Sequence, residues 1–332
     1  MGIISKGLHI VRWNEWYDSK LPLVAACAYY LSLLHPAPWI TSFKKVLISL
    51  LFYAFFISFG YLINDYCDRD LDQKAGKVRE IHSLSNRVVL ILLVLLFAFG
   101  WIILIPFWNL GFPLFIMVFI SYLISIFYSL PPVRLKERGF LGLLGASIAQ
   151  RFLPILVMGL IWQDLHIEII IWALIGFLVG MRYILIHQYE DLAADKTTGV
   201  QTFASRRLTF IPILMRIIFI CELIALFGII YLVSKRDILF IWIIGFVALY
   251  LVGYFFLYRK YIGRPGLLSF VYVPLEDIYS IFLPISLLVL LIKINPLWAL
   301  LLPIEVIWKY NCICQYMALP ARWLFSKFTL SR

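Results

Sequence analysis

Asn64-Asp65-Tyr66-Cys67-Asp68-Arg69-Asp70-Leu71-Asp72 is an acidic stretch that closes a long apolar segment of the chain. A second acidic stretch, Glu190-Asp191-Leu192-Ala193-Ala194-Asp195, closes another apolar segment. Carboxylates crowded in this way repel one another, and near a membrane they are poorly hydrated. A divalent cation between them would relieve both effects. The two stretches therefore predict a membrane protein organised around a metal-dependent site for an anionic ligand.

Composition places the chain among membrane proteins. Of its 332 residues, 63% are hydrophobic and only 14% are charged, and the mean hydropathy is +0.95. Typical globular chains are about half apolar and a quarter charged, which argues against a soluble domain. The formal net charge of +11 lies mostly in the loops, and membrane orientation explains it without a nucleic-acid partner. No segment alternates as the strands of a β-barrel do.

Apolar segments of about 20 residues predict the membrane spans. The candidates are residues 22–37, 46–64, 88–106, 112–130, 140–161, 167–187, 209–233, 238–257, 276–292 and 296–314. Prolines interrupt the last two candidates, so we predict an all-α polytopic membrane protein with a bundle of about nine transmembrane helices. The predicted regions are an interfacial N-terminal segment (1–21), the transmembrane bundle (22–292) and a hydrophobic, basic C-terminal extension (293–332).

The loop charges predict the orientation of this integral membrane protein. With a cytoplasmic N-terminus, most Lys and Arg residues of the loops fall on the inside, as the positive-inside rule requires. Both acidic stretches then lie on the cytoplasmic side, which in a bacterium is the inner face of the inner membrane. Each stretch closes an even-numbered span, the second and the sixth, so we also predict an internal repeat of four helices.

The acidic residues are spaced for one face of a helix, because positions three and four apart are neighbours there. Carboxylate and amide oxygens are the ligands that Mg²⁺ prefers. A solvated helix end is the alternative interpretation of either stretch alone. The candidate ligands are Asn64, Asp65, Asp68 and Asp72 in the first stretch and Asp191 and Asp195 in the second, with His187 one turn before Asp191 as a candidate to meet an acceptor or take its proton.

Basic residues accompany the acidic ones. Lys77 and Arg79 follow the first stretch, and Lys196 follows the second. Between them lies the segment Tyr128-Ser129-Leu130-Pro131-Pro132-Val133-Arg134-Leu135-Lys136, which we call the proline loop. Its two prolines stiffen the backbone, so Arg134 and Lys136 could point at an anionic group held by the metal. The alternative is positive-inside charge without a ligand.

These three elements resemble the UbiA-type intramembrane prenyltransferases. Residues 64–72 resemble the pattern NDxxDxxxD, and residues 191–195 resemble DxxxD, followed by Lys196 and Gly199-Val200-Gln201-Thr202. The proline loop is similar to the family's Tyr-Ser-x-Pro-Pro-x-Arg-x-Lys segment. The resemblance covers roughly residues 10–290, and its specificity comes from the three motifs together.

The resemblance implies a helical bundle around a central cavity and a Mg²⁺-dependent transferase. It implies that Mg²⁺ bridges the two acidic clusters, that a polyprenyl diphosphate is the donor, and that a lipophilic or aromatic acceptor is reached from the membrane lipid. Asn64, Asp68, Asp72, Asp191 and Asp195 would hold the metal, with Asp65 supporting. The candidate diphosphate-binding residues are Lys77, Arg79, Tyr128, Arg134, Lys136 and Lys196.

Two other interpretations stay open. A CDP-alcohol phosphotransferase also uses membrane aspartates, but its Asp-Gly and Ala-Arg pattern does not occur here. A secondary transporter could use carboxylates for a cation, although its site is expected at broken helices near mid-membrane. Among the remaining polar residues of the spans, Arg216 and Glu222 are expected to form a structural polar pair or an interface anchor, and Arg151 and Arg182 to face a partner or a cavity. The acceptor and the donor chain length are not readable from the sequence.

Overall fold

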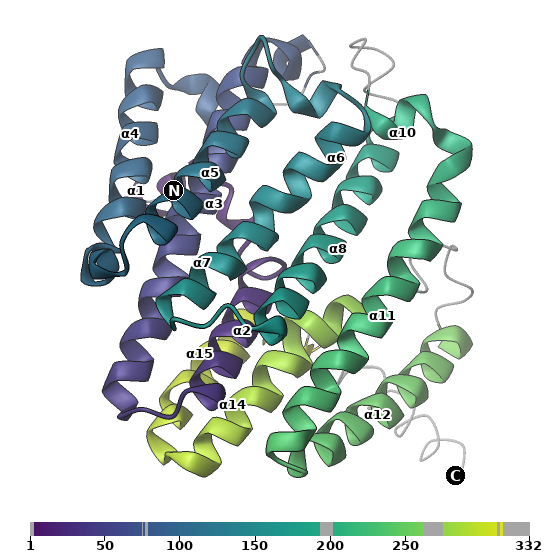
Figure 1. Cartoon of the computed structure of the whole chain (residues 1–332). Coiled ribbons are helices and arrows are strands. Elements are labelled where there is room, and N and C mark those ends of the chain that lie inside the picture. Colours follow the sequence, from purple (N-terminus) through teal and green to yellow (C-terminus); the bar gives the residue numbers. More distant parts are fainter. Residues whose placement is uncertain are drawn as a thin grey trace. The chain divides into compact units, whose positions relative to one another are not determined.

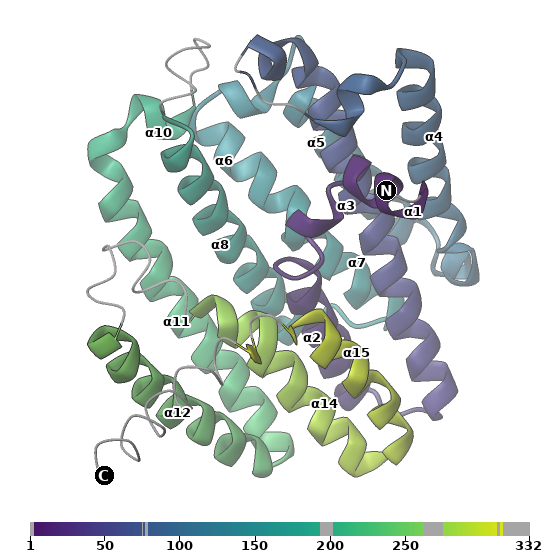
Figure 2. The same ribbon diagram turned by 180° about the vertical axis from the view of Figure 1, so that it is seen from behind.

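A computed structural model describes the protein as all-helical over the residues it covers, with no β-strand among them (Figures 1 and 2). The described residues are 3–74, 76, 79–192, 202–261, 275–310 and 313–314. This confirms the predicted all-α class. The predicted count of nine spans, the central cavity and the four-helix repeat stay predictions.

The chain divides into two compact units. Unit 1 comprises residues 1–16 and 43–229, and unit 2 comprises residues 17–42 and 230–332. The helices α3 (Trp39–Lys74) and α11 (Ile211–Arg236) contribute residues to both. The other elements of unit 1 are α1 (Ile3–Ile10), η1 (Trp13–Glu15), η2 (Glu80–Ser83), α4 (Asn86–Ile102), η3 (Ile105–Leu110), α5 (Phe112–Ser129), η4 (Leu135–Glu137), α6 (Phe140–Ser147), the π-helix η5 (Ile148–Phe152), α7 (Leu153–Ile161), α8 (Ile167–Glu190), α10 (Phe203–Arg206) and η6 (Leu208–Phe210).

Unit 2 joins a helix from the start of the chain to helices from its end. Its elements are α2 (Leu21–Leu34), α12 (Leu239–Tyr261), the π-helix η7 (Ile278–Phe282), α14 (Leu283–Ile294), η8 (Pro296–Leu301) and α15 (Leu302–Trp308). The helix α14 packs against α2. Tyr29 on α2 donates a hydrogen bond of 2.7 Å to the buried carboxyl group of Glu305 on α15. The C-terminal extension is therefore packed into unit 2 at least as far as α15.

Six helices of the described chain are long and apolar enough to cross a membrane. They span Trp39–Lys74, Phe112–Ser129, Phe140–Ile161, Ile167–Glu190, Leu208–Arg236 and Leu275–Ile294, and shorter apolar helices cover Leu21–Leu34, Asn86–Ile102, Leu239–Tyr254 and Pro296–Trp308. Large apolar side chains such as Val94 on α4 and Phe246 on α12 are exposed. In water such surface would be unfavourable, whereas contact with lipid tails accommodates it.

Three segments that carry the sequence motifs lie at one end of unit 1. In both ribbon views the C-terminal end of α3, the connection between α5 and α6, and the C-terminal end of α8 are on the same side of the unit (Figures 1 and 2). The alternating direction of successive helices produces this arrangement. The sequence predicted a common side for the three motifs, and which side of the membrane it is remains a prediction.

A π-helix interrupts the span Phe140–Ile161 for an identifiable reason. Pro154 has no backbone N–H, so it cannot donate to the carbonyl oxygen of Gln150 one turn earlier. The hydroxyl group of Tyr53 on α3 donates to that carbonyl at 2.9 Å instead. The same pattern, Ile-x-x-x-Phe-Leu-Pro, recurs at residues 278–284, where η7 is also a π-helix followed by Leu283 and Pro284. This recurrence agrees with an internal repeat, which stays a prediction.

The expected pairing of Glu222 with Arg216 is wrong. Glu222 on α11 accepts a hydrogen bond of 2.8 Å from Nε of Arg182 on α8, and both side chains are buried. The guanidinium groups of Arg182 and Arg151 lie 5.4 Å and 4.9 Å from the ring centre of Tyr183. Helix packing places Glu222 against α8 instead.

Candidate functional site

The first acidic stretch forms the last turns of α3. This helix continues to Lys74 and is followed by Gly76, whose φ of 70° suits a residue without a side chain. A stripe of oxygen-bearing side chains therefore runs along α3 as the spacing predicted. The C-terminal end of a helix already carries a partial negative charge, so these carboxylates need cations nearby.

Lys136 supplies one such cation. Its ammonium group donates to Oδ1 of Asn64 at 3.1 Å and also contacts Oδ2 of Asp68. Arg134 contacts Oδ1 of the same Asp68 at 2.8 Å, and Ser129 donates to Oδ1 of Asn64 at 3.1 Å. Burial lowers the pKa of Lys136, and the adjacent Asp68 carboxylate opposes that change. The proline loop thus meets the first acidic stretch directly.

Local structure explains how the proline loop reaches α3. Arg134 has a φ of 39°, a left-handed conformation that is uncommon for a residue with a side chain. Arg138 donates to the carbonyl oxygens of Val133 and Pro132, which folds the loop back on itself. Gly142 on α6 lies under the loop, where a Cβ atom would be 2.6 Å from the carbonyl oxygen of Leu135. The glycine therefore permits the close approach of the loop.

The other half of the stripe faces a different cation. Nε of Arg79 lies 3.1 Å from Oδ2 of Asp72 and 3.7 Å from Oδ1 of Asp65. Asp65 is only 2% exposed, and its Oδ1 also accepts a hydrogen bond of 3.1 Å from Nη1 of Arg12. Arg12 in turn donates to both carboxylate oxygens of Glu15, with Nε at 2.7 Å from Oε1. Asp65 is thus held between two guanidinium groups.

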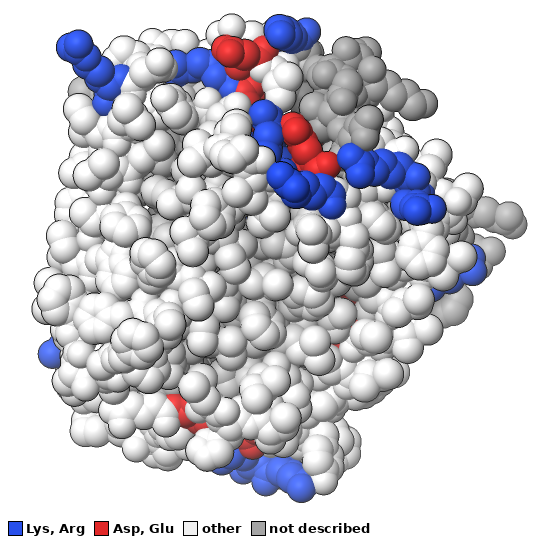
Figure 3. Space-filling view, turned by 45° about the horizontal axis from the view of Figure 1, so that its top comes forward, with Lys and Arg blue, Asp and Glu red and all other residues white. Residues whose placement is uncertain are grey.

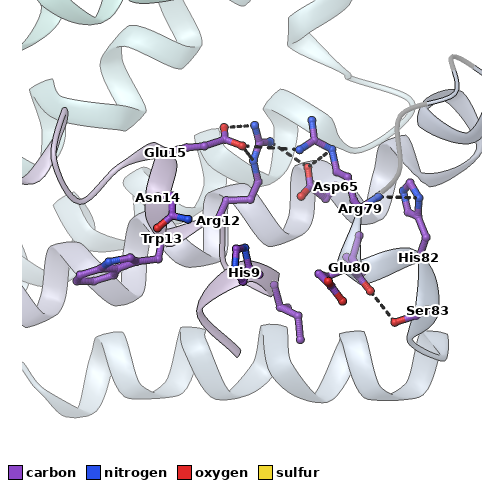
Figure 4. A pocket seen from close by; sticks show the side chains of 12 residues that line it. His9, Arg12, Trp13, Asn14, Glu15, Asp65, Arg79, Glu80, His82 and Ser83 are labelled. Atoms are coloured by element: carbon purple, nitrogen blue, oxygen red, sulfur yellow. Dashed lines mark hydrogen bonds and ion pairs between the residues drawn. The ribbon is translucent and has the colours of Figure 1, made fainter. Parts of the chain in front are cut away.

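A pocket of about 520 Å³ lies beside this network, between the N-terminal segment and η2 (Figure 4). Arg12, Glu15, Asp65 and Arg79 form part of its lining, and His82 lies on the η2 side. Sequence reasoning treated residues 1–21 only as an interfacial segment and missed Arg12 and Glu15. No spacing signal existed for Arg12, because it lies 53 residues before Asp65.

The second acidic stretch lies at the end of α8, which ends at Glu190. The Asp191 backbone N–H donates to the carbonyl oxygen of His187 at 2.9 Å. Nδ1 of His187 is 3.9 Å from Oε2 of Glu190, and both side chains are about two-thirds exposed. The predicted site residues Lys77, Asp195 and Lys196 lie outside the described residues. Tyr128 is partly buried at the end of α5.

Within the described residues, no three His, Cys, Asp or Glu side chains gather into a group suited to a metal ion. Bridging of both acidic stretches by one metal cluster therefore stays a prediction, since Asp195 lies outside the described part of the chain. The oxygens of Asn64 and Asp68, however, converge on a single cationic group, the ammonium of Lys136. An amide and a carboxylate oxygen that share a cation are a donor set that fits Mg²⁺.

Charged side chains of opposite sign are neighbours on the protein surface. Figure 3 shows blue Lys and Arg side chains beside red Asp and Glu side chains, whereas most of the visible surface is white. In unit 1 the pairs include Arg79 with Asp72 and Arg134 with Asp68. A site that presents both signs can hold a cation and an anion together.

The fold and this site define a class: a polytopic helical membrane protein with paired acidic and basic side chains at one end of its helices. The model of the UbiA prenyltransferase family matches residues 21–272. The chain belongs to this family, and it is an integral membrane protein. The resemblance drawn from the three sequence motifs is thereby confirmed.

Two plant proteins are similar to part of the chain. The chloroplastic chlorophyll synthases of Avena sativa and of Oryza sativa subsp. japonica are each 27% identical to it over 146 residues. Each match covers 42% of this chain and 39% of the relative. The chain therefore aligns with about two-fifths of the length of these curated relatives.

Solved structures share the fold over most of the chain. A UbiA homolog from Archaeoglobus fulgidus bound to GPP and Mg²⁺ superposes with a TM-score of 0.56 at 17% identity, covering 85% of this chain and 98% of that one. Digeranylgeranylglyceryl phosphate synthase gives a TM-score of 0.53 at 16% identity, covering 86% and 96%. At these identities the likeness shows the fold alone.

Proposed function

We propose that this protein is a Mg²⁺-dependent prenyltransferase that moves a polyprenyl group from an isoprenoid diphosphate to a lipophilic or aromatic acceptor in the membrane. Family membership supports the reaction class. The observation that carries the proposal is the convergence of Asn64 and Asp68 on one ammonium group, with Arg134 beside it. The fold neighbour bound to GPP and Mg²⁺ supports the choice of donor and metal.

The oxygens of Asn64 and Asp68 are the proposed core of the metal site. Asp72 extends the same helix face, and Asp191 and Asp195 are proposed to complete the site from the second acidic stretch, as the family resemblance implies. Bound Mg²⁺ would neutralise charge on the diphosphate and on these carboxylates. Asp65 supports the site from behind, because it is buried and held by Arg12 and Arg79.

The basic residues are proposed to bind the donor. Arg134 and Lys136 now contact Asp68, so binding of an Mg²⁺–diphosphate complex would free them to contact phosphate oxygens. As the C–O bond of the donor breaks, its electron pair passes to the diphosphate, and fixed cations stabilise the charge that develops there. Lys77, Arg79, Tyr128 and Lys196 are the remaining proposed contacts to the diphosphate.

The acceptor forms the new bond to the prenyl carbon and gives up a proton. His187 is the proposed base that takes this proton, because its ring is exposed one turn before Asp191. The apolar spans are proposed to keep water away from the prenyl group, since water would otherwise capture the allylic cation. The acceptor's identity is the finer question that activity measurements must answer.

The decisive experiment supplies donors of several lengths to the purified protein. Geranyl, geranylgeranyl and longer diphosphates are incubated with a panel of acceptors, with Mg²⁺ or with EDTA, and products are identified by mass spectrometry. We expect prenylated product and released diphosphate only with Mg²⁺. A transporter with a carboxylate cation site would release no diphosphate, so that result would overturn the proposal.

Substitutions in each acidic stretch test the site. We expect Asp68→Ala and Asp191→Ala each to abolish turnover while the protein still inserts into membranes, because each removes a proposed metal ligand. Asp70→Ala is the matched control, since Asp70 lies in the same stretch but is exposed. Near-normal activity of Asp68→Ala or Asp191→Ala would contradict the assignment.

A further inference from the structure

The N-terminal segment reaches the first acidic stretch through Arg12. This residue precedes the part of the chain that the family model matches, which begins at residue 21. Its guanidinium group bridges two carboxylates, with Nη1 3.1 Å from Asp65 and Nε 2.7 Å from Glu15 (Figure 4). Its side chain is 17% exposed, whereas the Asp65 side chain is only 3% exposed.

Arg12 has an uncommon backbone conformation, which sets its contact with Asp65 apart from an ordinary surface ion pair. Its φ is 53° and its ψ is 40°, in the left-handed region. Among the described residues other than glycine, only Arg12, Arg134 and Gln163 have a positive φ. Both arginines in this set contact the first acidic stretch. A side chain in this region costs energy and persists where surrounding contacts fix it, commonly at functional sites.

The charges around Asp65 are linked to those around Asp72. Nε of Arg79 lies 3.1 Å from Asp72 but 3.7 Å from Asp65, so Arg79 is shared unequally between them. Arg12 supplies the shorter contact to Asp65, at 3.1 Å. Burial alone would lower the pKa of Arg12, but the carboxylates of Asp65 and Glu15 outweigh burial and raise it, so the group stays charged.

Removal of Arg12 would therefore redistribute these contacts. A buried carboxylate that loses its closest cation is strongly destabilised. The cation nearest to hand is Arg79, which would move toward Asp65 and away from Asp72. Since Asp72 belongs to the proposed metal face, removal of Arg12 would weaken diphosphate binding indirectly, through Asp65 and Arg79.

We propose that Arg12 is a positioning residue for the donor site, acting through Asp65 and Arg79. The inference rests on the proposed function, because it takes Asp72 as one of the carboxylates of the proposed metal site. On this proposal, the N-terminal segment contributes to donor binding. Arg12 forms an ion pair with Asp65, so that Arg79 remains paired with Asp72. Glu15 fixes the position of Arg12 through a second ion pair.

The test compares Arg12→Gln with Arg12→Lys in the whole chain, solubilised in detergent. Binding of inorganic diphosphate in the presence of Mg²⁺ is measured by titration calorimetry, and steady-state kinetics give the KM for the donor and kcat. We expect Arg12→Gln to weaken diphosphate binding and raise the donor KM by about tenfold, with kcat changed less than the KM. Arg12→Lys keeps the charge but cannot bridge both carboxylates, so a smaller rise is expected.

Lys6→Gln is the matched control, because Lys6 is an exposed cation of the same N-terminal segment. It should leave diphosphate binding unchanged. A second control combines Arg12→Gln with Asp65→Asn. If Arg12 acts through Asp65, the double variant should bind diphosphate no more weakly than Asp65→Asn alone.

The outcomes separate this inference from the proposed function. Wild-type protein that fails to bind diphosphate in the presence of Mg²⁺ would count against the proposed function. Two results would overturn the role of Arg12 and leave the proposed function standing. The first is that Arg12→Gln binds diphosphate as tightly as the wild-type protein. The second is that the separate effects of Arg12→Gln and Asp65→Asn on binding multiply in full in the double variant. If Arg12→Gln does not fold, a donor KM that is unchanged in Arg12→Lys would also overturn that role.

Discussion

The ammonium group of Lys136 contacts both Asn64 and Asp68, and so occupies the place at the first acidic stretch where a metal ion is proposed to bind. Arg134 neutralises the remaining oxygen of Asp68. In this arrangement two cationic side chains compensate the Asp68 carboxylate, which lies at the negative end of a helix. A metal and Lys136 would then compete for the same oxygens, and the displaced ammonium would be free to contact an anion.

This competition predicts opposite effects of Lys136→Met on metal binding and on turnover. We expect turnover to fall roughly 100- to 1000-fold, the usual loss when one electrostatic stabiliser of a transition state is removed. Mg²⁺ binding measured without donor should be unchanged or tighter, because the competing ammonium is gone. Lys136→Arg, which keeps the charge, serves as the control and should retain more activity. Weaker Mg²⁺ binding by Lys136→Met would contradict the competition.

At the scale of elements, close packing of α6 against η4 positions the proline loop. Gly142 faces the backbone, since an added Cβ atom would lie 2.6 Å from the carbonyl oxygen of Leu135 and 2.9 Å from Cα of Lys136. Gly145, one turn later, faces the flexible end of the Leu135 side chain at 3.3 Å. The two glycines therefore differ in what a methyl group would displace.

We expect Gly142→Ala to reduce turnover roughly 10- to 100-fold, because a shift of about 1 Å in a positioning element has effects of this size. The methyl group would push the backbone that carries Lys136 away from α3. Gly145→Ala is the matched control, and the Leu135 side chain should adjust to it with little loss. Steady-state kinetics of both variants measure the difference, and equal activities would show that the loop tolerates displacement.

At the scale of the whole molecule, each unit is assembled from segments far apart in the sequence. Unit 1 brings residues 1–16 to the acidic end of α3, and unit 2 joins α2 to α14 and α15. Within unit 1, α8 has 24 residues and so rises about 36 Å. The two ends of α8, next to His166 and Asp191, are therefore about as far apart as the thickness of a bilayer core.

Orientation in the membrane is tested with single cysteines in a background where the native cysteines are replaced by serine. Arg87→Cys marks the start of α4, and His166→Cys marks the start of α8. Both side chains are exposed. We expect an impermeant thiol reagent to label the Arg87 position only from the cytoplasmic side of sealed vesicles, and the His166 position only from the other side. Labelling of both from one side would contradict the positive-inside assignment.

Much of this protein could be predicted from its sequence because hydrophobicity and helix spacing are local properties. Apolar length predicted the helices, and four-residue spacing predicted the stripe on α3. The stiff proline loop predicted that Arg134 and Lys136 point at an anionic group held by the metal, whereas their direct contacts with Asp68 were not predicted. The family followed from the order of the motifs. Pairings between distant segments had no local signal, which is why Glu222 was assigned to Arg216 rather than to Arg182.

The sequence by itself therefore determined the helical membrane class and the family, since each depends on residue type and short-range periodicity. Only the tertiary structure decided which cation meets which carboxylate. Asn64 and Asp68 face Lys136, whereas Asp65 faces Arg12, which lies 53 residues earlier in the chain. Those pairings depend on how helices pack and where loops turn, and no spacing along the chain encodes them.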